Sequence, residues 1–398
     1  MRIPNGLDEK TIAARLDRFE IETPSWGYAD TGTRFGKFLQ AAAAQTIAEK
    51  LADAACVHKL TGVAPDVAVH VLWDFKSDTD PNEVARFAES LGVRIGSINP
   101  NVFQDQAYKL GSVSNVDPLI RRKAIDHILA CVKLGRAVGS KVLTLWFADG
   151  TNYPGQGDMA RRKRWFQEAL AEVHAALPPT MTMLLEYKPF EPCFYHTDVA
   201  DWGMSYVYCK RTGPQAKVLV DTGHHLQATN IEHIVAFLID EEMLGGFHFN
   251  DRKYADDDLT MGSIDPYQLF RIFVEITKAE RERGRDLPIA YMIDQSHNIK
   301  PKIEAMIQTV TTAQEYFTKA LLVDHEAAAA ARARGDIVLA ERALRDAFAT
   351  DVRDFLEAWR SARGLPRDPL LAFRESGYEA RVAAERAPKK TLGGGSYA

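Results

Sequence analysis

Short apolar runs rich in β-branched residues alternate along most of the chain with longer segments in which apolar residues recur every three or four positions. Runs of the first kind are typical of buried strands, and the longer segments are typical of helices that bury one face. The pattern predicts strands at Phe19–Thr23, Val67–Trp73, Val93–Asn99, Lys141–Phe147, Thr180–Tyr187, Lys217–Asp221, Gly246–Asn250 and Pro288–Asp294. After a leading helix at Leu7–Asp17, it predicts helices at Gly36–Leu60, Asn82–Leu91, Pro118–Val138, Ala160–Leu177, Thr197–Lys210, Ile231–Asp240, Pro266–Arg283 and Lys300–Thr318.

Strict alternation of strands and helices favours a parallel sheet with right-handed crossovers. Eight such units favour a closed (β/α)₈ TIM barrel over an open doubly wound sheet. An open sheet is expected to carry a Gly-rich phosphate loop after an early strand, and the sequence has no GxGxxG or GxxxxGK[ST] motif. The fold class predicted is therefore α/β, a (β/α)₈ barrel with a short N-terminal helix.

The pattern changes near residue 320, because Asp324–Ala362 is rich in Ala, Arg and Glu with helical periodicity and no strand follows. We therefore expect a barrel with its lid loop in residues 1–319 and a helical C-terminal extension in residues 320–398, with a mobile Gly-rich tail. Such an extension must bury its apolar stripe somewhere. Packing on a neighbouring subunit is the favoured expectation, and covering the base of its own barrel is the alternative.

The charge balance narrows the possible partners. The chain of 398 residues carries a net charge of −5, and a nucleic-acid binder usually has a basic surplus. No apolar stretch is long enough to span a membrane, the charged N-terminus lacks a signal-peptide core, and the four cysteines are widely spaced. These features predict a cytoplasmic protein that binds neither nucleic acid nor membrane.

Candidate chemistry lies where four successive predicted strands end, the face at which TIM barrels place their active sites. The strands end in or next to Glu186 and Lys188, Asp221 and His224, His248, and Asp294 with Ser296 two residues later. A single Asp or His at a strand end is commonly a helix cap or a hydrogen-bonded core group. A run of buried acids, however, requires cations. Glu186, Asp221, His248 and Asp294 offer three carboxylates and one imidazole, a set that suits Mn²⁺, Mg²⁺ or Co²⁺ and tolerates Zn²⁺.

Other residues extend this candidate site. The acidic loop after the seventh strand places Asp256 and Asp258 two positions apart, and with His224 they can hold a second ion bridged by Asp221. A solvated loop is the ordinary explanation for such acids. His70 and Trp146 lie in or at the end of other predicted strands. His70 can contact a sugar or make a hydrogen bond within the core. The Trp146 ring can pack on a sugar or cap the core. Trp26 and Phe35 lie in an early loop that can act as a lid or reach a neighbouring site. Both are candidate substrate contacts, and so is Ser296 after the eighth strand.

Five motifs together give a family resemblance: E-x-K at Glu186, D-T-G-H-H at Asp221, F-H-F-N-D around His248, the D-D-D loop, and I-D-Q-S-H-N at Asp294. From about Trp26 to Asn298 the chain resembles the xylose-isomerase-like superfamily, and Asp221 and His248 at the sixth and seventh strands make it similar to the L-rhamnose isomerases. The resemblance implies a structural metal held by Glu186, Asp221, His248 and Asp294, and a catalytic metal at His224, Asp256 and Asp258. It also implies Mn²⁺, Co²⁺ or Zn²⁺ as the ions and a homotetramer as the assembly.

The resemblance further assigns roles around the substrate. Lys188 is expected to bind a substrate oxygen, His70 to assist ring opening, Trp146 to pack on the sugar, and Phe35 to enter a neighbouring subunit's site. The expected reaction is aldose–ketose isomerisation, most of all L-rhamnose to L-rhamnulose, with other aldoses such as D-allose to D-psicose. A hydride shift needs no protein base, whereas an enediol route needs one, and Asp294 or a metal-bound hydroxide are the candidates. A single-metal keto-sugar 3-epimerase, a metal-dependent hydrolase and a non-catalytic sugar-binding barrel are the alternatives.

Overall fold

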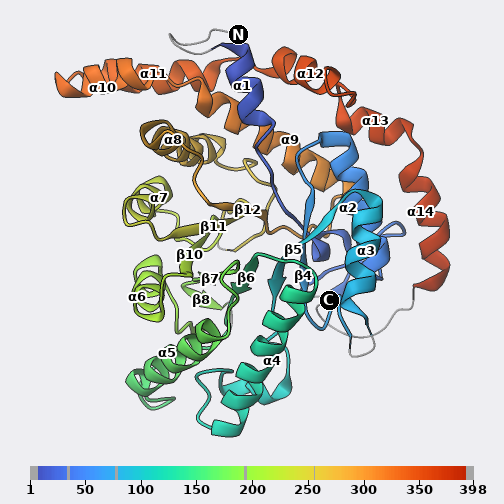
Figure 1. Cartoon of the computed structure of the whole chain (residues 1–398), viewed down its shortest axis with the longest axis vertical. Coiled ribbons are helices and arrows are strands. Elements are labelled where there is room, and N and C mark those ends of the chain that lie inside the picture. The colour runs from blue at the N-terminus through green and yellow to red at the C-terminus, as the bar shows by residue number, and fades with distance from the viewer. Residues whose placement is uncertain (1–7, 34–35, 77–78, 192–194, 255, 391–398) are drawn as a thin grey trace.

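The computed structural model describes residues 8–33, 36–76, 79–191, 195–254 and 256–390, and these form the predicted (β/α)₈ barrel (Figure 1). Phe35, Cys193 and most of the Gly-rich tail lie outside the described residues. Within the described ranges, one sheet of eight parallel strands has the order β1-β4-β5-β6-β7-β10-β11-β12. The strands are β1 (Thr23–Pro24), β4 (Asp66–His70), β5 (Arg94–Asn99), β6 (Val142–Leu145), β7 (Thr182–Glu186), β10 (Ala216–Asp221), β11 (Leu244–Phe249) and β12 (Ala290–Ile293).

The barrel closes between its first and last strands through the main chain of Glu22. The Glu22 amide donates to the Tyr291 carbonyl (2.8 Å), and the Ile293 amide donates to the Glu22 carbonyl (2.9 Å). Its carboxylate turns into the barrel, where it accepts a hydrogen bond of 2.7 Å from the Ser97 amide. A Cβ on Gly96 would come within 1.7 Å of the Glu22 Oε2 atom, so this approach requires glycine.

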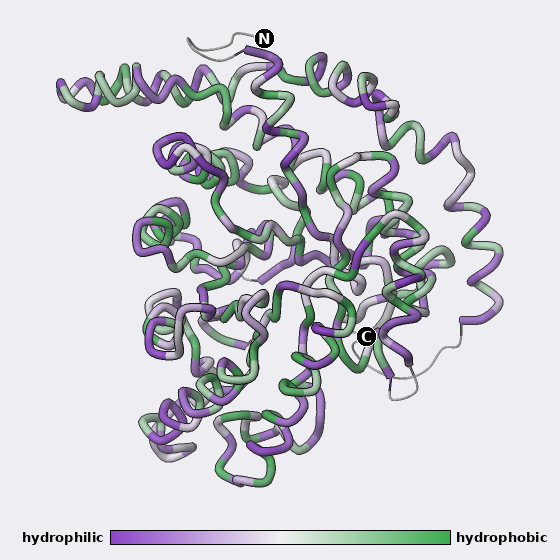
Figure 2. Tube along the Cα trace, in the orientation of Figure 1, coloured by the Kyte–Doolittle hydropathy of each residue, from purple (hydrophilic) through white to green (hydrophobic). Residues whose placement is uncertain are grey.

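Helices surround the strands, and most begin where a side chain caps the first turn. The helices of the barrel are α1 (Glu9–Leu16), α2 (Ile47–Thr61), α3 (Pro81–Leu91), α4 (Pro118–Ala137), α5 (Met159–Ala175), α6 (Trp202–Thr212), α7 (Ile231–Asp240), α8 (Pro266–Arg283) and α9 (Lys302–Leu321). Hydrophilic and hydrophobic stretches alternate along the outer helices (Figure 2), as expected for helices that bury one face. Two short hairpins, β2–β3 (Gly32–Thr33, Gly36–Lys37) and β8–β9 (Phe190–Glu191, Tyr195–His196), lie in loops that the sequence pattern did not resolve.

Several predicted elements differ from the structure in their bounds. The strand predicted at Phe19–Thr23 is β1 at Thr23–Pro24. The helix predicted from Gly36 begins only at Ile47, because Thr46 and Glu49 form a capping box there. The strand predicted to reach Trp73 ends at His70, since Leu72 adopts a positive φ of 86° and the chain turns back. The helix predicted from Thr197 begins at Trp202, where the Asp201 side chain accepts a hydrogen bond from the Met204 amide.

The C-terminal part of the described chain is helical throughout, in α10 (His325–Ala333), α11 (Ile337–Ala349), α12 (Arg353–Ser361), α13 (Pro369–Glu375) and α14 (Tyr378–Arg386), with a 3₁₀ turn at Ala387–Lys389. Helix α12 lies beside α9, and helices α13 and α14 run along the outside of the barrel beside α2 (Figure 1). Helices α10 and α11 pack on each other, and α11 also packs on α9. The Trp359 indole donates to Asp17 at 3.0 Å, and Arg386 forms a buried ion pair of 2.7 Å with Asp53. Helices α12 and α14 thus contact the barrel of their own chain, and packing of the extension on a neighbouring subunit stays a prediction.

No helix among the described residues is long and apolar enough to cross a membrane.

Candidate metal centre

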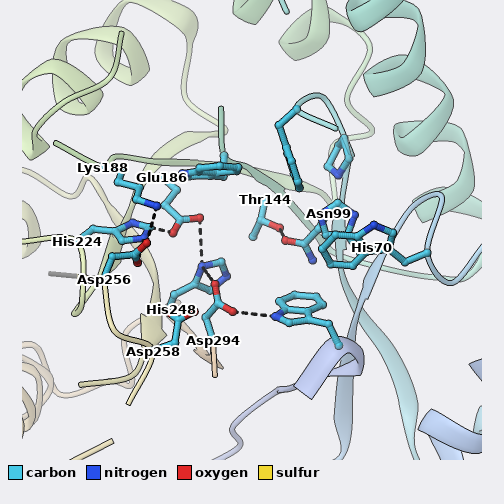
Figure 3. Close-up of a pocket in the computed structure, with 15 residues that line it drawn as sticks. His70, Asn99, Thr144, Glu186, Lys188, His224, His248, Asp256, Asp258 and Asp294 are labelled. Carbon is cyan, nitrogen blue, oxygen red and sulfur yellow. Dashed lines mark hydrogen bonds and ion pairs between the residues drawn. The ribbon is translucent and has the colours of Figure 1, made fainter. Parts of the chain in front are cut away.

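A cavity of about 170 Å³ opens at the C-terminal ends of the barrel strands. At about 30 Å³ per water molecule, it holds roughly five waters or one small ligand. Figure 3 shows two groups of side chains in it, with carboxylates and imidazoles on one side and aromatic and neutral polar groups on the other. The lining residues are Trp26, His70, Trp73, Asn99, Pro100, Phe103, Thr144, Trp146, Glu186, Lys188, His224, His248, Asp256, Asp258 and Asp294.

Four of the sequence-predicted ligands converge at the ends of β7, β10, β11 and β12. Glu186, Asp221, His248 and Asp294 each offer one ligand atom, and these four atoms all lie within 4.8 Å of one another. Glu186, Asp221 and His248 are buried. The His248 Nδ1 atom is buried 3.2 Å from Glu186 Oε2 and 3.6 Å from Asp294 Oδ2, but among the described groups it has no partner with the geometry of a hydrogen bond. An orphaned imidazole nitrogen facing carboxylates fits a divalent ion, and this group can therefore hold a metal.

Burial and mutual repulsion of the three carboxylates decide the electrostatics of this four-ligand group. Burial raises the pKa of Asp221 to about 7, and the charges of Glu186 and Asp294 add to the shift. Burial lowers the pKa of His248, but the neighbouring carboxylates outweigh it and raise the pKa to about 9. Burial also works to raise the pKa of Glu186, but His248 and His224 hold it well below its usual range. Protons thus occupy the group when no cation is bound, and metal binding must release them.

A second set of predicted ligands lies directly beside the first. The His224 Nε2 atom is 2.9 Å from Asp256 Oδ1 and 3.9 Å from Asp221 Oδ2. Its other nitrogen, Nδ1, lies 3.0 Å from the Tyr187 carbonyl oxygen, which accepts only from an N–H. The proton on Nδ1 directs Nε2 at the carboxylates, which outweigh burial and raise the pKa of His224 well above its usual value when no cation is bound. With an ion bound, Nε2 would be the ligating atom.

The loop after β11 is shaped to bring its acids into the cavity. Asp256 and Asp258 both adopt a positive φ of 46°, a conformation that is uncommon outside glycine and that clusters at functional sites. Burial, together with the charges of Asp256, Asp294 and Asp221, raises the pKa of Asp258 well above its usual value. Lys188 supplies the nearest cation, with its Nζ atom 2.5 Å from Asp256 Oδ2 and 2.8 Å from Glu191 Oε2.

The opposite side of the cavity is aromatic. The His70 ring stacks on Trp73 with centroids 3.8 Å apart, and Phe103 meets the edge of Trp146 at 4.9 Å. Burial lowers the pKa of His70 to about 4, so its imidazole is neutral at pH 7. Its Nδ1 atom lies 3.3 Å from the Val71 carbonyl, which places the proton on Nδ1 and leaves Nε2 as an acceptor.

The remaining predicted residues fall in different places. Trp26 lines the cavity, and its indole also donates to Asp294 Oδ1 at 2.8 Å, so it orients a member of the four-ligand group. Trp146 lines the cavity with its indole nitrogen buried and unpaired. Ser296 does not line the cavity; its hydroxyl is buried nearby without a hydrogen-bond partner among the described residues.

Sequence reasoning missed six residues here: Trp73, Asn99, Pro100, Phe103, Thr144 and Glu191. Asn99 ends the strand that was predicted to end there, so the strand-end rule itself would have found it. Thr144 sits inside β6 and donates its hydroxyl to the Asn99 amide oxygen. Trp73 and Phe103 lie on loops, where no periodicity points to a side chain's direction.

Comparison with known proteins places the chain in a family. Residues 58–286 match a family model described as xylose isomerase-like TIM barrel. A probable sugar isomerase of Rhizobium meliloti (strain 1021) is 42% identical over 98% of this chain and 91% of its own length, and one of Mesorhizobium japonicum is 41% identical over the same shares. Among solved structures, an L-ribulose 3-epimerase covers 80% of this chain and 98% of its own, with a TM-score of 0.52 at 14% identity, which supports the fold.

Proposed function

The chain belongs to the xylose isomerase-like TIM-barrel family, and on that premise we propose that it is a metal-dependent aldose–ketose isomerase that converts L-rhamnose to L-rhamnulose. D-Allose to D-psicose is proposed as a further reaction of the same site. Two divalent ions serve the reaction, with Mn²⁺ the first choice and Co²⁺ or Zn²⁺ able to replace it. The observation that carries this proposal is the second ligand set at His224 and Asp256, 2.9 Å apart, directly beside the four-ligand group.

Each proposed ion has a donor set of suitable chemistry. Glu186, Asp221, His248 and Asp294 would hold the first, and His224, Asp256 and Asp258 the second, with Asp221 between them. Oxygen-rich sets with one imidazole suit Mn²⁺ and its neighbours. Ions at these positions supply positive charge at the sugar oxygens and lower the pKa of a hydroxyl group there.

The protein's own groups bind and orient the open-chain sugar. Lys188, already near the Asp256 carboxylate, donates through Nζ to a substrate oxygen and fixes the reacting end. The neutral His70 ring accepts a proton at Nε2 and assists ring opening. Asp256 carries the proton between O1 and O2 of the substrate. If hydrogen moves between C1 and C2 through an enediol, Asp294 is the base; a direct hydride shift needs none.

The aromatic side of the cavity supports a 6-deoxy sugar. Trp73 and Phe103 lie with ring centroids 6.2 Å apart beside His70, and Pro100 extends the same apolar wall. Burying a methyl group there gains about 0.8 kcal/mol, whereas a hydroxyl without a hydrogen-bond partner costs about 1–3 kcal/mol. L-Rhamnose carries a methyl group where L-mannose carries the 6-hydroxymethyl group, so this wall favours L-rhamnose.

A homotetramer is proposed as the assembly. Ile337 and Val338, the first two residues of α11, are 64% and 80% exposed. They follow the turn between α10 and α11. Such exposed apolar residues are typical of an interface with another subunit. Phe35 is proposed to reach a neighbouring cavity in that assembly. Light scattering of the purified protein tests the mass of the assembly.

The decisive experiment removes the metals with a chelator, restores Mn²⁺, and follows L-rhamnose by NMR in both states. The proposal expects L-rhamnulose to form only with metal. A C3 epimer of an added ketose, without any aldose–ketose conversion, would instead favour a single-metal 3-epimerase. No conversion of any aldose with metal bound would refute the isomerase proposal. Running the reaction in D₂O separates the routes, because an enediol exchanges hydrogen with solvent and a hydride shift does not.

A further inference from the structure

Arg252 occupies an unusual position between the two loops that carry the second ligand set. It follows β11 by three residues and is 8% exposed. Its guanidinium donates through Nε to the His225 carbonyl (2.6 Å), through Nη1 to the Thr222 carbonyl (2.9 Å) and through Nη2 to the Leu226 carbonyl (3.0 Å). A fourth bond, of 3.4 Å, joins Nη1 to the Gln268 amide oxygen. All four acceptors are neutral oxygens, and three belong to one loop.

That loop carries His224, whereas Arg252 belongs to the segment that leads to Asp256 and Asp258. The two loops are joined at other points as well: the Thr222 hydroxyl donates to the Asn250 carbonyl at 2.9 Å, and the Gln227 amide donates to the Lys253 carbonyl at 3.3 Å and to that of Tyr254. Arg252 lies between these points and makes three carbonyl bonds to the loop of His224. The planar guanidinium group holds its N–H donors at fixed positions and can therefore fix three carbonyl oxygens relative to one another. The single ammonium group of a lysine cannot fix them in this way.

We propose that Arg252 is a positioning residue that sets the spacing between His224 and Asp256, and thereby the affinity of the second metal site, without touching the metal. The inference rests on the proposed two-metal function. The first metal site draws its ligands from four strand ends and shares only Asp221, at the end of β10, with the second, so it depends less on the relative placement of these two loops. Loss of the Arg252 bridge to Thr222, His225 and Leu226 therefore weakens the second site selectively. Residues behind metal ligands typically change affinity by about 10–100-fold when replaced.

The test compares the chelator-treated wild type with Arg252→Lys by calorimetric titration with Mn²⁺ alone. Wild type is expected to bind two ions. Arg252→Lys is expected to bind the second at least tenfold more weakly, with the first affinity within about twofold. Arg360→Lys is the matched control, because Arg360 is also buried and also donates to neutral oxygens, the Arg367 carbonyl at 3.1 Å and the Gln314 amide oxygen at 2.9 Å, but on α12. It should leave both affinities unchanged.

The other outcomes are distinguishable. A wild type that binds one ion overturns the two-metal proposal and this inference with it. Two unchanged affinities in Arg252→Lys overturn the positioning role alone. An equal loss at both sites, or the same loss in Arg360→Lys, shows a merely structural role and also overturns it. Where Arg252→Lys does not fold, Gln227→Ala at the exposed edge of the same two loops replaces it, and there we expect a several-fold loss confined to the second site.

Discussion

Replacing Asp221 with asparagine should make the metal-free protein more stable at pH 8, although it removes a proposed ligand. Asp221 is fully buried, and its pKa rises from 3.8 to about 7 because of burial and the charges of Glu186 and Asp294. At about 1.4 kcal/mol per unit, holding this carboxylate ionised costs the folded state about 4 kcal/mol. Coulomb repulsion between charges within 4.8 Å is of the same order, about 3.5 kcal/mol per pair at an effective dielectric constant of about 20.

The sign and the pH window follow from the raised pKa. A carboxyl group whose folded pKa exceeds its unfolded value costs nothing below about pH 4, costs more as the pH rises, and costs its full amount above about pH 7. Asparagine does not ionise, and its side-chain oxygen keeps the bonds from the Gly223 amide (2.7 Å) and the Asn250 side chain (3.0 Å). The stability of Asp221→Asn relative to wild type should therefore grow by about 1.4 kcal/mol per pH unit between pH 4 and 7 and then level off.

Urea unfolding with a chelator at pH 4, 6 and 8 measures this difference. Adding Mn²⁺ should narrow the difference at pH 8, because an ion at 100 times its dissociation constant stabilises wild type by about 2.7 kcal/mol and binds the variant weakly. Asp149→Asn serves as the control for the metal effect, since Asp149 is buried but held by Ser112 and Ser114 outside the four-ligand group. A stability difference that does not grow with pH, or a variant that gains as much from Mn²⁺ as wild type, would refute the reasoning.

Three further outcomes follow from the site and its supports. Asp256→Asn should lower kcat by about 100-fold or more with little change in melting temperature. The adjacent Asp257→Asn is the control and should keep its activity, because its side-chain oxygen can still accept from the Lys253 and Tyr254 amides. Near-wild-type turnover of Asp256→Asn would contradict the second ligand set. Phe103→Ala should reduce the kcat/KM preference for L-rhamnose over L-mannose by about tenfold, and an unchanged ratio would remove the aromatic wall as its cause. Asp53→Ala should lower the free energy of unfolding by about 3–5 kcal/mol in urea titrations, because it leaves the buried Arg386 with only its longer ion pair of 4.0 Å to Glu49. The folded fraction should keep its activity.

The sequence predicted the barrel well where local chemistry and tertiary packing agree. Helices α7 and α8 have the predicted bounds because Asn230 and Asp265 cap their first turns and Pro266 occupies the first helical position of α8. The capping box at Thr46 is also a local signal in the sequence. The alanines before it are good helix formers, however, so the helix was predicted to begin too early. The limits of the short first strand were the hardest to predict, because they depend on its pairing with β4 and with the last strand.

The same distinction between local sequence patterns and long-range packing applies to the site. The four-ligand group was predictable because parallel strands bring their C-terminal ends together, and alternation decides which side chains turn inward. Where a side chain from a loop points depends on long-range packing, so Trp73 and Phe103 escaped the sequence. Trp26 was predicted as a sugar contact, but its bond to Asp294 joins residues 268 positions apart, and no local pattern encodes it.

The barrel closes between Glu22 and Tyr291. The edge of the first strand that pairs there therefore stays unpaired until the ribosome has synthesised the last barrel strand. Tyr291 follows Glu22 by 269 positions, so at about 5–20 residues per second that edge is open for roughly 13–54 s. During synthesis the strands from β4 to β11 form a growing parallel sheet with exposed edges, a form prone to aggregation. Helices α12 and α14, which contact Asp17 and Asp53, are translated after the last barrel strand and can bind these residues only then.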